Sequence, residues 1–173
     1  MTVAVSVPVH TVIDSPVGAL TLVAEDAALT GIYFAIHRRR DRLPDFGELV
    51  SSSGLFGDAA RQLGEYFAGD RRVFDLPLAP RGDQFQQSVW AQLRQIPYGQ
   101  TRSYGDLAKA IGRPGAAQAV GAANGANPLS IVVPCHRVLG ADGSLTGYAG
   151  GLGRKRFLLE LERPAADVEG RLF

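Results

Sequence analysis

The sequence has few of the residues that build disulfide frameworks and metal sites. Its 173 residues include one cysteine, Cys135, which excludes an internal disulfide and predicts a reduced thiol. The three histidines, His10, His37 and His136, are far apart in the chain, and no Cys or His pair has the spacing of zinc ligands. The residues therefore predict no metal site and no cofactor.

Long apolar runs and an export signal are also missing. No apolar stretch approaches the roughly 20 residues that span a membrane, and the mildly apolar residues 1–12 lack a basic n-region. We expect a soluble cytoplasmic protein that does not enter a membrane. With 46% hydrophobic residues, the chain can bury the core of one ordinary domain or of two small ones.

Charge is distributed unevenly, although the formal net charge is only +1. Residues 1–75 hold seven Lys and Arg against ten Asp and Glu, whereas residues 84–156 hold eight against two. A basic segment joined to an acidic one favours a polyanionic partner for the basic part. The alternative is an ordinary solvated surface.

The first half of the chain has the pattern of a small sheet followed by a helix. Short stretches rich in Val, Ile, Leu and Thr predict an antiparallel meander, and helical spacing predicts a helix after it. The predicted strands are 9–13, 19–24 and 29–35, followed by a loop over 38–54 with a solvated arginine cluster at 38–42, a helix at 55–67, a last strand at 73–76 and a linker at 77–83.

The second half changes to the period of helices. Asp83 is suited to cap a helix that buries Phe85, Val89 and Leu93 on one face and ends at residues 96–97. After a turn, Ser103 and Asp106 form a capping-box-like pair that opens a second helix, which ends at Gly112.

A third helix is predicted over 116–123, with Pro114 in its first turn and a stop at Asn124 and Gly125. Together with the second helix it matches a helix-turn-helix. Its many Ala and Gly residues offer few groups that could hydrogen-bond base edges, so sequence-specific recognition is not expected. Small residues instead allow close approach to a nucleic acid, and the alternative is tight packing inside the protein.

Cys135 follows an apolar run that stops at Pro134, and it is followed by His136 and Arg137. A thiol is a good nucleophile only when deprotonated, and a neighbouring positive charge or histidine base lowers its pKa from about 8.5. A lone cysteine is often just a buried apolar residue, but a histidine and an arginine are poor neighbours for that role. Because adjacent strand residues point to opposite faces, contact between the thiol and His136 needs a turn or a bridging water.

These features together resemble the O6-alkylguanine-DNA alkyltransferases, which repair DNA and are consumed in doing so. The likeness is most specific over 85–162, above all at Pro134-Cys135-His136-Arg137-Val138, and looser at 13–18. It implies an α+β protein: a small N-terminal α/β domain of ribonuclease-H-like shape with an antiparallel sheet (1–76), a linker (77–83), and a mainly helical, winged-helix-like C-terminal domain with the helix-turn-helix (84–163). The tail, 164–173, is expected to be loosely ordered.

The resemblance also implies the reaction. The Cys135 thiolate attacks the alkyl carbon of O6-alkylguanine, and by extension of O4-alkylthymine, with the base as leaving group. The damaged base is flipped out of double-stranded DNA, which the protein binds from the minor groove. In solution the protein is expected to be a monomer, and its assembly along DNA is left open. The thioether product is not easily hydrolysed, so each molecule acts once and needs no cofactor.

By position in the motif, four further residues carry the chemistry. His136 takes the thiol proton, through a water, and Glu162 orients His136; the alternative for Glu162 is a solvated acid on a helix over 154–162. Tyr104 protonates the leaving base, and Asn127 ties the helix-turn-helix to the Cys135 segment.

The resemblance assigns the remaining site residues to the base pocket and to DNA. Tyr148 and the backbone near Ala149 and Gly150 wall the pocket and hold O6, and the carbonyls of Cys135 and Val138 accept from the exocyclic amine. Relatives often have serine where Ala149 stands, which removes a hydroxyl here. The residues implied to contact DNA are Ser103, Arg113, Ala117, Gln118 and Arg137.

Gln118 departs from the family, whose members use an arginine at this position to enter the base stack. Glutamine can fill the vacated space, but it lacks the positive charge; Arg113 is the neighbour that could compensate. Two rival functions are left open by the sequence: a cysteine hydrolase, since Cys and His also build acyl-transfer sites, and a helix-turn-helix regulator or damage sensor without chemistry.

Overall fold

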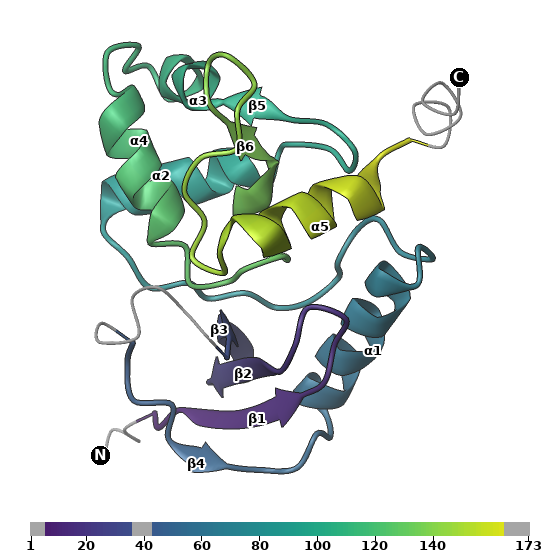
Figure 1. Ribbon diagram of the computed structural model, residues 1–173. Coiled ribbons are helices and arrows are strands. Elements are labelled where there is room, and N and C mark those ends of the chain that lie inside the picture. Colours follow the sequence, from purple (N-terminus) through teal and green to yellow (C-terminus); the bar gives the residue numbers. More distant parts are fainter. Residues whose placement is uncertain (1–5, 36–42, 165–173) are drawn as a thin grey trace, which may run out of the picture. The chain divides into compact units, whose positions relative to one another are not determined.

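The computed structural model describes residues 6–35 and 43–164 (Figure 1). The predicted arginine cluster at 38–42 and the predicted tail from residue 165 lie outside these ranges. Contacts divide the chain into two compact units. Unit 1 runs to Arg81 and also includes Pro128–Ser130, and unit 2 consists of Gly82–Asn127 and the chain from Ile131 onward. The boundary between the units after Arg81 lies inside the predicted linker. The sequence did not predict that residues 128–130 belong to unit 1.

Unit 1 contains a sheet with the strand order β3-β2-β1-β4. The strands β1 (Val9–Ile13), β2 (Leu20–Glu25) and β3 (Ala28–Phe34) form the predicted antiparallel meander, with bounds within one residue of those expected. The short strand β4 (Glu48–Leu49) pairs parallel with β1. The sequence predicted a loop there, because two exposed residues show no alternation.

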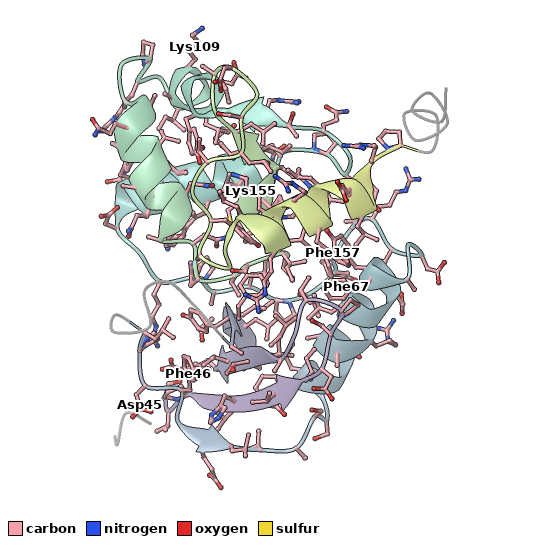
Figure 2. All side chains as sticks on the ribbon, in the orientation of Figure 1. Asp45, Phe46, Phe67, Lys109, Lys155 and Phe157 are labelled. Atoms are coloured by element: carbon pink, nitrogen blue, oxygen red, sulfur yellow. The ribbon has the colours of Figure 1, made fainter. Side chains whose placement is uncertain are left out.

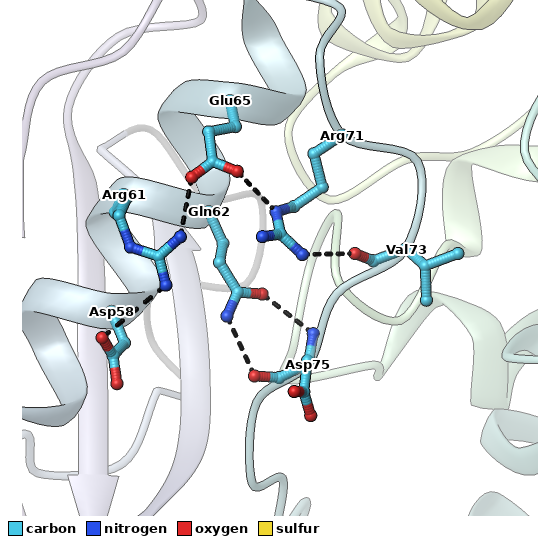
Figure 3. A network of polar contacts seen from close by, with 7 residues as sticks. All are labelled: Asp58, Arg61, Gln62, Glu65, Arg71, Val73 and Asp75. Atoms are coloured by element: carbon cyan, nitrogen blue, oxygen red, sulfur yellow. Dashed lines mark hydrogen bonds and ion pairs between the residues drawn. The ribbon is translucent and has the colours of Figure 1, made fainter.

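The helix α1 (Leu55–Phe67) has the predicted bounds and buries Phe56, Ala59, Leu63 and Tyr66. The strand predicted at 73–76 is wrong. The Gln62 side chain donates to the Asp75 carbonyl at 2.9 Å and accepts from the Asp75 N–H at 2.8 Å, so it occupies the groups that a ladder would use (Figure 3). On the exposed side of α1, Arg61 and Arg71 both pair with Glu65. Pairing with the sheet occurs a few residues later, where Leu78 bridges Leu29.

Unit 2 is mainly helical, and its first two helices begin as predicted. Asp83 caps α2 (Gln84–Leu93) in a capping box with Gln86, and Ser103 caps α3 (Tyr104–Ala110) in a capping box with Asp106. The helix α2 ends earlier than the predicted 96–97. A small parallel pair, β5 (Arg102–Ser103) and β6 (Val138–Leu139), and the helix α5 (Leu152–Glu162) complete the unit.

The helix α4 (Ala117–Gly125) packs against both α2 and α3. The predicted stop at Asn124 and Gly125 is wrong, since both residues are helical, and Pro114 lies before the helix instead of in its first turn. Asparagine usually weakens a helix because its side chain competes for nearby backbone groups. Here the buried Asn124 amide hydrogen-bonds a distant carbonyl, so that competition is removed. Within the described ranges, no helix is long and apolar enough to cross a membrane.

Candidate active site and nucleic-acid interface

The chain reaches Cys135 through a strained turn. Residues 128–130 pair with β3 in unit 1, where the Ile32 N–H donates to the Pro128 carbonyl at 2.8 Å. The next residue, Ile131, has a φ of +74°, which is rare for a β-branched side chain. The chain then enters a buried run that ends in a 3₁₀ turn, Cys135–Arg137. This is the turn that the sequence required if Cys135 and His136 were to face one site.

His136 and Glu162 form a buried pair. The His136 side chain is fully buried, and its Nε2 lies 2.7 Å from Glu162 Oε2. Burial lowers the pKa of His136, although the hydrogen bond and charge of Glu162 oppose this. We therefore take His136 as a neutral imidazole that donates its Nε2 proton to Glu162. Its Nδ1 is buried and has no hydrogen-bond partner among the described residues, so it is an available base.

Arg137 is committed to the same carboxylate. Its Nε and Nη2 donate to Glu162 at 2.7 and 3.0 Å, and its Nη1 donates to the Ile96 carbonyl at 2.7 Å. Burial raises the pKa of Glu162, but the hydrogen bonds from His136 and Arg137 and the charge of Arg137 outweigh it and hold the pKa at about 2. Arg137 is only 6% exposed, which argues against the DNA contact predicted for it.

The Cys135 thiol is buried, and its surroundings differ from the sequence expectation. Burial raises the pKa of the thiol, while a hydrogen bond with Asn127 and the charge of Lys155 act to lower it. The adjacent Arg137 does not contribute, because its guanidinium is held by Glu162. The groups that favour the thiolate are thus distant in sequence.

Lys155 is the functional candidate that the sequence analysis missed. Its side chain lies inside unit 2, unlike that of the exposed Lys109 (Figure 2). Its Nζ donates to the Thr146 carbonyl at 2.7 Å, and burial lowers its pKa to about 8 against the opposing effect of Cys135. Helical spacing was the available signal, because Lys155, Leu158 and Glu162 share the buried face of α5.

Two asparagines at the end of α4 hold the Cys135 segment. The Asn127 Nδ2 donates to the Val133 carbonyl at 2.8 Å, in agreement with a tie between the helix-turn-helix and this segment. The Asn124 Nδ2 donates to the Cys135 carbonyl at 3.3 Å. The sequence predicts Asn124 only as a helix stop.

The predicted pocket residues lie in the loop before α5. Tyr148 and Gly150 are buried, and Ala149 is half-buried. The Tyr104 hydroxyl, which comes from α3, donates to the Thr146 carbonyl at 3.4 Å. Because Lys155 Nζ binds the same carbonyl, α3, α5 and the loop meet at Thr146. Val138 is buried directly after the Cys135 turn.

The predicted DNA contacts other than Arg137 lie in or next to α3 and α4. Gln118 and Arg113 are exposed, and Ser103 and Ala117 are half-buried. The Arg113 guanidinium lies 5.5 Å from the centre of the Phe85 ring, which restricts where its charge can be. No three His, Cys, Asp or Glu side chains gather as metal ligands in the part of the chain that the structure describes.

Comparison with known families agrees with this geometry. The sequence model of one family, the DNA binding domain of 6-O-methylguanine DNA methyltransferase, matches residues 84–164. The sequence model of a second family, the ribonuclease-like domain of 6-O-methylguanine DNA methyltransferase, matches residues 9–80. The chain belongs to this methyltransferase family.

Individual relatives cover nearly the whole methyltransferase. This chain is 51% identical over 161 residues to the methylated-DNA–protein-cysteine methyltransferase of Mycobacterium bovis, and the match covers 93% of this chain and 96% of the relative. The corresponding protein of Methanosarcina acetivorans is 48% identical over 153 residues, with 88% and 97% covered. A crystal structure of Mycobacterium tuberculosis OGT in complex with DNA has 52% sequence identity and a TM-score of 0.78, covering 90% of this chain and 95% of that one.

These matches confirm the family, the α+β fold class with an N-terminal sheet domain and a helical C-terminal domain, and the enzyme activity predicted from the sequence. That activity is the repair of DNA by transfer of an alkyl group to a cysteine of the methyltransferase itself.

Proposed function

We propose that this methyltransferase takes the alkyl group from O6-alkylguanine, and from O4-alkylthymine, in double-stranded DNA onto Cys135. The observation that carries the proposal is the surroundings of the only thiol: a hydrogen bond from Asn127, the charge of Lys155, and a neutral His136 as the next residue in the chain. A nucleophile, a base and a nearby cation are what displacement at an alkyl carbon requires.

The reaction begins with transfer of the thiol proton. His136 Nδ1 accepts the thiol proton, through a water, and Glu162 stabilises the resulting imidazolium. The Cys135 sulfur forms a bond to the alkyl carbon as the bond from that carbon to O6 breaks, and Tyr104 donates a proton to the leaving guanine. The Tyr104 phenolate then takes up, through water, the proton that His136 holds, so the net proton transfer is from the thiol to guanine. Arg137 holds Glu162 and does not contact DNA.

The delivery of the base follows from the burial of the thiol. Cys135 is 3% exposed, so a base must leave the duplex stack to reach it. We assign this step to α4, which enters the minor groove with Gln118 filling the vacated space. The carbonyls of Cys135 and Val138 then accept from the guanine 2-amino group, and Tyr148, Ala149 and Gly150 wall the pocket. Because the reaction consumes a reduced thiol, we place the protein in the cytoplasm.

Intact mass spectrometry after incubation with a methylated-guanine oligonucleotide tests the proposal. The wild type should gain one methyl group per molecule and then stop, while Cys135→Ser gains none. The absence of the adduct, or the same adduct on Cys135→Ser, contradicts the proposal and favours a damage sensor without chemistry. Sustained turnover of a simple ester would instead indicate a cysteine hydrolase.

A further inference from the structure

Two side-chain amides on α4 and its end hold the chain on both sides of Pro134. Asn127 donates to the Val133 carbonyl at 2.8 Å and Asn124 donates to the Cys135 carbonyl at 3.3 Å. We call this pair the amide clamp. Proline has no N–H to donate, so the segment that carries the nucleophile depends on side chains for part of its hydrogen bonding.

The orientation of the Asn124 amide is fixed by its partner. A carbonyl oxygen only accepts hydrogen bonds, so the nitrogen of Asn124 must face Cys135. The other end, Oδ1, is buried and has no hydrogen-bond donor among the described residues. A buried acceptor without a donor is destabilising, so stability alone does not account for an asparagine at this position, where the residue is 3% exposed.

The carbonyl that Asn124 holds belongs to the nucleophile residue itself. In an O6-alkylated guanine N1 carries no proton, so the 2-amino group is the only donor on the edge of the base that bears O6. A carbonyl beside the sulfur can therefore recognise that amino group, provided that the carbonyl is held in one direction.

We infer that Asn124 is a positioning residue that aims the Cys135 carbonyl at the 2-amino group of the damaged base and so sets the preference for guanine. This rests on the proposed function, since it concerns the base that Cys135 receives. Asn124 sets this preference indirectly, by holding the Cys135 carbonyl, and does not contact the reacting atoms.

The test compares duplexes that contain O6-methylguanine or O6-methylhypoxanthine, which lacks the 2-amino group. The wild type should react faster with the guanine. In Asn124→Leu, which keeps the volume and removes the amide, this preference should fall about fivefold, the size expected for one hydrogen bond. The hypoxanthine rate should change little. Val120→Ala, which removes buried apolar atoms from the same helix, should leave the ratio of the two rates unchanged.

A second measurement reports the hydrogen bond directly. Because the chain has one cysteine, cysteine labelled with ¹³C at its carbonyl gives a single labelled site in the protein. Its NMR resonance should move to lower chemical shift in Asn124→Leu and stay in place in Val120→Ala.

The outcomes separate the two proposals. If the wild type transfers no methyl group from either duplex, the proposed function fails. If it transfers from both at equal rates, or if Asn124→Leu keeps the wild-type ratio or the wild-type resonance, the function stands and the role of Asn124 is wrong.

Discussion

At the scale of single residues, the two cations nearest the site have different tasks. Arg137 follows the nucleophile in sequence, but its guanidinium neutralises Glu162. Lys155, twenty positions away, is the cation that acts on the thiol. The sequence neighbours of Cys135 therefore predicted that a cation assists the thiol but indicated the wrong residue, because the 3₁₀ turn leaves the Arg137 guanidinium bound to Glu162.

Replacing Lys155 by methionine should slow alkylation at neutral pH by at least about tenfold. Loss of the positive charge disfavours the thiolate, so the pKa of Cys135 rises and the pH–rate curve moves to higher pH. Rates of methyl transfer measured between about pH 6 and pH 10 check this. Lys109→Met removes the same charge from an exposed position and should leave the curve in place. A Lys155→Met curve that coincides with the wild type would falsify the electrostatic role.

Glu162 should make stability depend on acid pH. Its folded pKa of about 2 lies below the ordinary 4.5, so its contribution to the free energy of unfolding is complete above about pH 4.5 and is lost as the pH falls toward 2. Glu162→Gln leaves Arg137 without its ionic partner and should cost about 3 kcal/mol at neutral pH. Urea unfolding should show this difference shrinking below pH 4.5. A difference for Glu162→Gln that stays constant as the pH falls would exclude the linkage.

At the scale of elements, local chemistry was predictable and distant pairing was not. The starts of α2 and α3 followed from caps that lie within four residues, Asp83 with Gln86 and Ser103 with Asp106. The strand β4 and the bridge at Leu78 depend on partners tens of residues away. Lys155 resembles a solvated charge in the sequence, and only the packing of α5 buries it. The motif located Cys135, His136 and Glu162, whereas the fold was needed to show that Arg137 faces inward.

The exposed face of α4 should limit how well duplex DNA is repaired. Gln118 is exposed near the start of this helix and carries no charge, so Gln118→Arg should repair a methylated duplex several-fold faster or bind it more tightly, because arginine adds an attraction to phosphate. Rates on a single-stranded oligonucleotide, in which no stack must be opened, should rise less than those on the duplex. Gln84→Arg adds the same charge on α2 and controls for net charge. Equal duplex rates and affinities for wild type and Gln118→Arg would sink this prediction.

At the scale of the whole molecule, unit 2 has fewer positive charges at its surface than its sequence suggests. Of the eight Lys and Arg over 84–156, Arg137 and Lys155 are buried, so they are not available to phosphates. The exposed Arg113, held against Phe85, is the better candidate for a backbone contact. Fewer phosphate contacts mean a weaker dependence of DNA binding on salt than the charge count suggests.

Arg113→Gln should lower the affinity for DNA of any sequence and reduce the slope of log K against log salt by about one. Titrations at several salt concentrations measure the slope. Arg61→Gln, in the exposed network of α1, removes an equal charge from unit 1 and should not alter it. An unchanged slope in Arg113→Gln would remove this residue from the interface.

Residues 128–130 belong to unit 1, although the residues before and after them belong to unit 2, and this limits where the protein can be cut into fragments. A fragment that starts at Gly82 looks like a complete helical domain, yet it would carry Leu129, fully buried in the intact chain, without the β3 backbone that pairs with it. Such a fragment would expose an apolar side chain six residues before its nucleophile and lose one of the anchors that precede the strained Ile131. A version of this protein that is produced in parts therefore needs both units.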